Sequence, residues 1–152
     1  MNYLFIFASL VAMATSGRAQ SNKVIFVCEH GAAKSVIAAA YFNKIAKERN
    51  VDWQAVSRGT SPDAEIGQST KEGLTADHLY DPTFSPKKLS LKDTSNVKAI
   101  IRFTTLPGEF NKANIKTEDW SNLRDIDSGY TLRRDAIVHQ INEFLDSLPQ
   151  KK

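Results

Sequence analysis

The sequence predicts an α/β domain with a small, doubly wound, mostly parallel four-stranded sheet flanked by helices. Short apolar runs at residues 23–27 and 97–103 show no alternation of apolar and polar side chains. That pattern is typical of strands buried on both faces of a parallel sheet. Residues 34–49, directly after the first run, change to helical spacing. Strand and helix patterns then alternate to the end of the chain, without a repeat or a low-complexity tract, which indicates a single α/β unit.

The other elements are expected in the following order. Residues 53–57 form a second strand, which Gly59 and the turn sequence TSPD bring to an end. A helix over 66–77 and a loop with two prolines, DPTFSPKKLS, precede the strand at 97–103, and residues 113–120 form a weak fourth strand. Arg133 and Arg134 are interpreted as a solvated face of the closing helix. Its apolar stripe consists of Leu132, Ala136, Ile137, Ile141, Leu145 and Leu148.

The first residues of the chain have the character of a signal peptide. Residues 3–14 form an apolar run of the length of a signal-peptide core, too short to span a bilayer. Gly17 and Ala19 suit the two small-residue positions of a cleavage site. We therefore expect residues 1–19 to be removed, residues 20–152 to form the domain, and the protein to be periplasmic or secreted. An uncleaved anchor is the alternative, because no basic side chain precedes the apolar run.

Composition excludes several classes of function. The chain has 152 residues, of which 41% are hydrophobic and 24% charged, as in an ordinary globular domain. A formal charge of +3 is too small to indicate a nucleic-acid partner, although it slightly favours anionic ligands. His30, His78 and His139 lack metal-ligand spacing, so no metal site is expected. The cysteine-based chemistry described below would need no metal or organic cofactor. A single cysteine, Cys28, cannot form an internal disulfide.

The residues at the end of the first strand are the candidates for a catalytic site. Cys28 ends that strand, and the loop EHGAA leads directly into a helix. In open α/β sheets ligands bind at the carboxyl ends of the strands, and the amides of such a loop and of a first helical turn can hold an oxyanion. The same positive field favours a nucleophilic thiolate, and Lys34 adds a cation. A thiolate below a phosphate-sized anion site suits phosphoryl transfer through a cysteinyl-phosphate.

Each of these residues also has a purely structural interpretation. Cys28 can be a small buried hydrophobic residue, Lys34 a solvated lysine, and Ser35 an N-cap of the helix.

The stretch VIFVCEHGAAKSVIAAAYFNKIA resembles the N-terminal signature of low-molecular-weight protein tyrosine phosphatases and of the arsenate reductases that share their fold, whose loop is C-x5-R-S. AVSRGTSP is similar to the second strand and turn of that family. The resemblance implies that Cys28 is the nucleophile, that Lys34 takes the place of the phosphate-clamping arginine, and that Ser35 hydrogen-bonds the sulfur. The loop residues implied to bind substrate are Glu29, His30, Gly31, Ala32 and Ala33.

The loop departs from the family pattern at several positions. Lysine is a point charge, whereas arginine offers a planar fork that holds two phosphate oxygens. His30 stands where the family usually has glycine and Gly31 where it has asparagine, which bears on the loop conformation. Glu29 places a carboxylate beside a site meant for an anion.

The general acid of the family lies in an Asp-Pro pair between the fourth strand and the last helix. Here the only such pair, Asp81 and Pro82, precedes the third strand and is expected to be a turn. The segment in the right order, WSNLRDIDSGY, offers Asp125 and Asp127 as candidate catalytic acids, and Tyr130 to line the substrate entrance. Capping of the last helix by Asp127 or Ser128 is the alternative.

The resemblance therefore implies a cysteine-dependent phosphatase that hydrolyses phosphate monoesters. Its partner would be a phosphorylated small molecule or a phosphotyrosine-bearing protein, with no nucleic acid and, after signal cleavage, no membrane. Two alternatives stay open. One is a non-catalytic protein that binds a free oxyanion or a phosphorylated ligand. The other is an arsenate reductase that uses an external thiol, since the chain has no further cysteine for an internal disulfide cascade.

Overall fold

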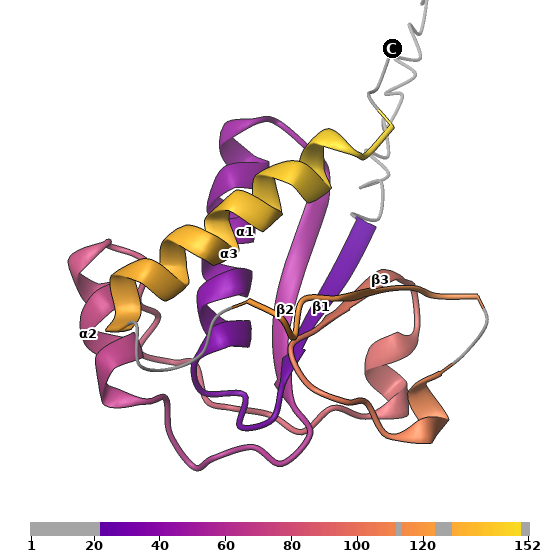
Figure 1. Cartoon of the computed structure of the whole chain (residues 1–152), viewed down its shortest axis with the longest axis horizontal. Helices are drawn as coiled ribbons and strands as arrows, with labels where there is room; N and C mark the ends of the chain where they lie inside the picture. The colour runs from indigo at the N-terminus through magenta and orange to yellow at the C-terminus, as the bar shows by residue number, and fades with distance from the viewer. Residues whose placement is uncertain (1–21, 112–113, 124–128, 150–152) are drawn as a thin grey trace, which may run out of the picture.

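A computed structural model of the chain describes residues 22–111, 114–123 and 129–149 (Figure 1). The strands are β1 (Asn22–Cys28), β2 (Trp53–Gly59), β3 (Val97–Arg102) and β4 (Lys116–Asp119). The helices are α1 (Lys34–Glu48), α2 (Gln68–Ala76) and α3 (Gly129–Asp146), with 3-10 turns η1 (Leu91–Thr94) and η2 (Gly108–Phe110). All seven predicted strands and helices are therefore present, with ends that differ from the prediction by a few residues.

The four strands form one parallel sheet in the order β2-β1-β3-β4. The chain adds β2 on one side of β1 and then β3 and β4 on the other, which confirms the doubly wound α/β fold. Cys28 pairs with Gly59 of β2, and Val27 pairs with Arg102 of β3. The direction of strand addition reverses at β1, so the carboxyl end of β1 is where such a sheet opens a crevice.

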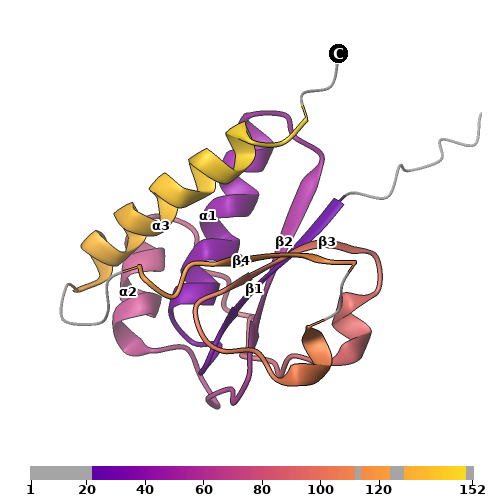
Figure 2. The same ribbon diagram turned by 45° about the vertical axis from the view of Figure 1, so that its right-hand side comes forward.

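The two faces of the sheet are covered differently. Helices α1 and α3 lie side by side over one face (Figures 1 and 2), and an aromatic cluster packs between them and the sheet. In that cluster Phe26 of β1 lies with its ring centroid 5.7 Å from the rings of both Phe42 and Trp120. The other face is covered by the segment around η1 and η2 rather than by an α-helix, with Leu106 and Phe110 in its core. The strand that carries Cys28 is thus buried on both sides.

The closing helix α3 differs in part from the predicted stripe. Ile137, Ile141 and Leu145 are buried as expected, but Leu132 is 62% exposed and Arg133 is buried. The prediction of a solvated face is therefore wrong for Arg133. The reason is helical geometry: position 133 precedes Ile137 by four residues and shares its inward face, whereas position 132 is rotated away by about 100°.

The start of β1 and the end of α3 lie near one another, at the end of the sheet opposite the carboxyl end of β1 (Figures 1 and 2). Among the described residues no helix is long and apolar enough to cross a membrane. The predicted signal peptide, residues 1–19, lies outside the described residues, so cleavage and export stay predictions.

Candidate active site

Cys28 is the last residue of β1 and is buried, with 8% of its surface exposed. Its Sγ lies 2.9 Å from Oγ of Ser35, the second residue of α1. Ser57 of β2 donates a hydrogen bond to the Ser35 hydroxyl at 2.8 Å. Because Ser35 accepts the proton of Ser57, its own proton can be directed to the Cys28 sulfur. The Ser35 hydroxyl is thus a hydrogen-bond partner of the Cys28 sulfur.

Four carbonyl groups at the start of the loop and within it face one neighbouring segment, residues 60–67. The carbonyls of Cys28, Glu29, His30 and Ala32 accept hydrogen bonds from the amides of residues 60, 61, 63 and 67 at 2.8–3.1 Å. A trans peptide holds its C=O and the following N–H on opposite sides, and the described residues contain no cis bond.

The amides of residues 29, 30, 31 and 33 therefore point away from the 60–67 segment. In the described parts of the chain, no oxygen accepts a hydrogen bond from the amides of residues 29–33.

Two glycines hold this loop against the end of β2. Gly31 has a positive φ of 59°, and a Cβ there would lie 3.0 Å from the backbone nitrogen of Gly59. A Cβ on Gly59 would lie only 2.8 Å from the nitrogen of Gly31 and 3.0 Å from the carbonyl oxygen of Glu29. The close approach of the two backbones fixes the loop. Because the left-handed conformation falls on Gly31, the histidine at position 30 does not have to adopt it.

Helix α1 begins at Lys34, a half-buried residue, and Ala33 precedes it without a side-chain cap. The interpretation of Ser35 as an N-cap is therefore wrong, because Ser35 lies inside the helix and its hydroxyl contacts Cys28 and Ser57. The first turn of α1 also holds no acidic residue. The positive end of the helix dipole consequently acts on the loop without a carboxylate from that turn to offset it.

Glu29 and His30 lie at the exposed rim of the loop, whereas Ala32 is buried and Ala33 half-buried. Nδ1 of His30 contacts Oδ1 of Asp63 at 3.1 Å, and its other ring nitrogen lies 3.9 Å from the carboxylate of Glu29. The imidazole thus links the loop to the 60–67 segment at the surface and lies beside the Glu29 carboxylate.

The candidate acids Asp125 and Asp127 lie outside the described residues. Asp81 and Pro82 lie in an exposed turn between α2 and β3, as predicted. There the hydroxyl and amide of Thr83 both donate to Asp81, which lowers the pKa of its carboxyl.

Tyr130, in the first turn of α3, donates a 2.6 Å hydrogen bond to Asp77, and its ring lies against Gly73 of α2. Its hydroxyl is therefore engaged by the Asp77 carboxylate.

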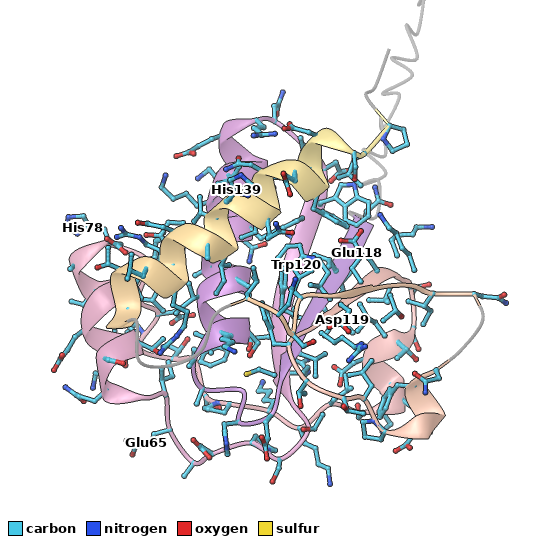
Figure 3. The ribbon with its side chains drawn as sticks, in the orientation of Figure 1. Glu65, His78, Glu118, Asp119, Trp120 and His139 are labelled. Carbon is cyan, nitrogen blue, oxygen red and sulfur yellow. The ribbon has the colours of Figure 1, made fainter. Side chains whose placement is uncertain are left out.

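The described residues hold no cluster of three or more potential metal ligands. His78 follows α2 and His139 lies on α3, well apart in Figure 3.

Sequence reasoning missed the contributions of β2 and of the segment that follows it. Ser57 completes the chain of hydroxyl groups, Gly59 supports the loop, and residues 60–67 receive the loop carbonyls. The available signal was Gly59 at the end of the second strand, with Ser57, Thr60 and Ser61 beside it, because a close backbone approach requires a residue without a side chain.

Comparison with known proteins places the fold. No protein-family model matches the sequence, and no curated protein does.

Solved structures do match, each over more than four fifths of the chain. A low molecular weight protein tyrosine phosphatase from T. tengcongensis gives a TM-score of 0.74 at 18% identity, covering 84% of this chain and 100% of that one. An arginine phosphatase of drosophila gives 0.72 at 16%, covering 86% and 99%. An arsenate reductase from Archaeoglobus fulgidus gives 0.62 at 23%, covering 82% and 99%. The chain has the fold that these proteins share.

Proposed function

We propose that the protein hydrolyses phosphate monoesters through a cysteinyl-phosphate on Cys28. The thiolate attacks phosphorus and displaces the ester oxygen, which takes a proton from Asp125 or Asp127. Water then attacks the phosphorus of the intermediate, releasing inorganic phosphate and restoring the thiolate. The observation that carries the proposal is the loop itself: outward carbonyls, amides without described acceptors, and a sulfur beside a hydroxyl donor.

Electrostatics support this assignment of roles. The equatorial oxygens of the transferred phosphoryl group carry negative charge in the transition state, and fixed backbone amides stabilise such charge without reorganising. The end of α1 contributes its dipole, and Lys34, the first residue of that helix, is the proposed cation of the site.

A second candidate function follows from the identity of Lys34. A single ammonium can hold an oxyanion, but it does not clamp two equatorial oxygens as a guanidinium does. A protein that binds phosphate, arsenate or a phosphorylated ligand without turnover therefore fits the same loop. The arsenate reductase in the comparison makes a third activity worth measuring, with an external thiol as reductant.

Hydrolysis of p-nitrophenyl phosphate by the purified protein, compared with Cys28→Ser, tests the leading proposal. We expect turnover by the native protein and none above background in the variant. Equal rates in the two proteins would refute the proposal.

Thermal unfolding and calorimetric titration with inorganic phosphate show whether Cys28→Ser keeps its fold and its anion site. Phosphate binding by both proteins, without turnover by either, selects the binding function instead. Release of arsenite from arsenate that depends on added glutathione identifies the reductase.

A further inference from the structure

A cavity of about 700 Å³ lies between α1, the edge strand β2 and the segment 79–87. Neither Cys28 nor residues 29–34 line it; of the residues described above at the proposed active site, Ser57 and Ile66 border it. Its volume falls within the roughly 300–1,000 Å³ of cavities that take small organic ligands.

The outer wall of this cavity is fixed by backbone hydrogen bonds at both ends. At one end Gly59 donates to the carbonyl of Lys87 at 2.9 Å and accepts from the amide of Leu89 at 2.8 Å. At the other end the amides of Leu79 and Tyr80 donate to the carbonyl of Leu74 at the end of α2, at 2.8 and 3.1 Å. The segment is thus tied to β2 and to α2, and the cavity is part of the fold.

The inner surface of the cavity is mainly apolar, formed by Val36, Ala39, Ala40, Ala55, Leu74 and Phe84. Several polar backbone groups at the β2 edge are already paired, namely those of Ala55 and the carbonyl of Ser57. The side chain of Asn43 accepts from the amide of Ala55 at 2.7 Å and donates to its carbonyl at 3.0 Å, and Arg58 donates to the carbonyl of Ser57 at 2.8 Å. The edge of β2 therefore offers little to an added peptide strand, and an occupant must bind through apolar contact.

Charge around the cavity is predominantly positive. Lys44, Lys47, Arg58 and Lys87 line it, and among the described residues Asp81 is the only acidic one that does. Lys44 pairs with Glu48 at 2.7 Å, whereas neither Lys47 nor Lys87 forms an ion pair with a described residue. A ligand with an anionic group on an apolar body would complement both the lysines around the cavity and its apolar inner surface.

We propose that this cavity binds a small amphipathic anion, an aromatic or fatty body that carries one carboxylate, sulfonate or phosphate group. The apolar body contacts the α1 and β2 side chains, and the anionic group lies toward Lys47 and Lys87. The proposal goes beyond the proposed catalysis at Cys28 and does not depend on it.

Two dyes that share an aromatic body but differ in charge test this proposal on the full chain. 1-Anilinonaphthalene-8-sulfonate carries a sulfonate, and N-phenyl-1-naphthylamine does not. We expect one anionic dye per chain, bound at least about tenfold more tightly than the neutral dye. Amide NMR shifts caused by the anionic dye should map to residues 36–47, 55–58 and 79–87.

Charge reversal at Lys47 and Lys87 distinguishes a specific anion site from nonspecific hydrophobic binding of the dye. The double variant Lys47→Glu Lys87→Glu should weaken the anionic dye by about tenfold or more and leave the neutral dye unchanged. A matched reversal of an exposed lysine on β3, Lys98→Glu, should change neither affinity.

Equal affinities for the two dyes, or an anionic-dye affinity that survives the double reversal, would overturn the proposal. So would sedimentation showing that a second copy of the chain covers the cavity and that the dye dissociates the pair. Thermal unfolding of each variant verifies that it remains folded.

Discussion

Ser35 is the residue on which the environment of Cys28 depends most. It is fully buried and lies between the Cys28 sulfur and the Ser57 hydroxyl, at 2.9 and 2.8 Å. Since Ser57 donates to the Ser35 hydroxyl, the Ser35 proton can be directed to the sulfur. This hydroxyl contact distinguishes Cys28 from a cysteine that is surrounded only by apolar side chains.

Lys34 decides how well the proposed site can catalyse. Lys34→Arg supplies a planar fork that can bind two equatorial phosphate oxygens, so we expect p-nitrophenyl phosphate turnover to rise. Lys34→Ala should lower turnover by about 100-fold, the usual loss when one transition-state donor is removed. Steady-state kinetics measure both changes.

The control for Lys34→Arg is Lys44→Arg, a lysine on the same helix with an exposed side chain that pairs with Glu48. Its turnover should equal that of the native protein. A loss of activity in Lys34→Arg would mean that the loop is adapted to lysine.

At the scale of elements, the loop after β1 depends on the end of β2. Gly59→Ala would place a methyl group 2.8 Å from the nitrogen of Gly31 and 3.0 Å from the carbonyl oxygen of Glu29. Both are backbone atoms, so neither can move aside as a flexible side chain would. We expect this variant to lose about 2 kcal/mol of unfolding free energy and to lose phosphate binding, because the loop must shift. Chemical denaturation and calorimetry measure the two effects.

Gly108→Ala is the matched control, since nothing lies within 4 Å of a Cβ at that position. It should be close to native in both measurements. Native phosphate affinity in Gly59→Ala would show that the anion site does not depend on this contact.

Asp77 joins three helices at one carboxylate. Tyr130 and Tyr41 each donate to it at 2.6 Å, and Arg134 contacts it at 3.3 Å. The hydrogen bonds from Tyr130 and Tyr41 lower the pKa of Asp77. The folded pKa therefore lies below the unfolded one, so the stabilisation is complete above the unfolded pKa and is lost as pH falls through the folded value.

Asp77→Asn should lower the unfolding free energy by about 2 kcal/mol near neutral pH, since the removed charge accepts strong hydrogen bonds. Its stability should also fall less than that of the native protein between about pH 5 and pH 2. Urea denaturation over this range provides the measurement. Asp146→Asn, at an exposed pair with Arg49, serves as control. Identical pH profiles for the native protein and Asp77→Asn would contradict this account.

Much of the fold could be predicted from the sequence because its strands and helices each have a local pattern of apolar residues. Continuous apolar runs marked the buried strands β1 and β3, and helical spacing marked α1. The placement of Cys28 at the end of β1 and Ser35 beside its sulfur agrees with the sequence expectation.

Contacts between distant segments could not be read in the same way. Three contacts bring together residues that are 22 to 57 positions apart: the approach of Gly31 to Gly59, the hydroxyl of Ser57 and the carboxylate of Asp77. Short spacing carries no information about such contacts. The burial of Arg133 was not predicted, because an arginine is expected at the surface, whereas its position on the helix places it on the same face as Ile137.

For the molecule as a whole, export is a prediction that direct measurement can check. Expression of the full chain in a bacterial host should yield periplasmic protein that begins at Gln20, because cleavage follows Ala19. Intact mass and N-terminal sequencing identify the start. Ala19→Arg, which removes the small residue before the cut, should retain the leader. Cytosolic protein with its leader intact would contradict the prediction.

The most direct test of the central claim is the detection of a covalent intermediate. Native protein mixed with an aryl phosphate and quenched in acid should gain the mass of one phosphoryl group, and peptide mapping should place it on the Cys28 sulfur. Aryl phosphate turnover without this adduct on Cys28, or with the phosphoryl group on another residue, would contradict the account.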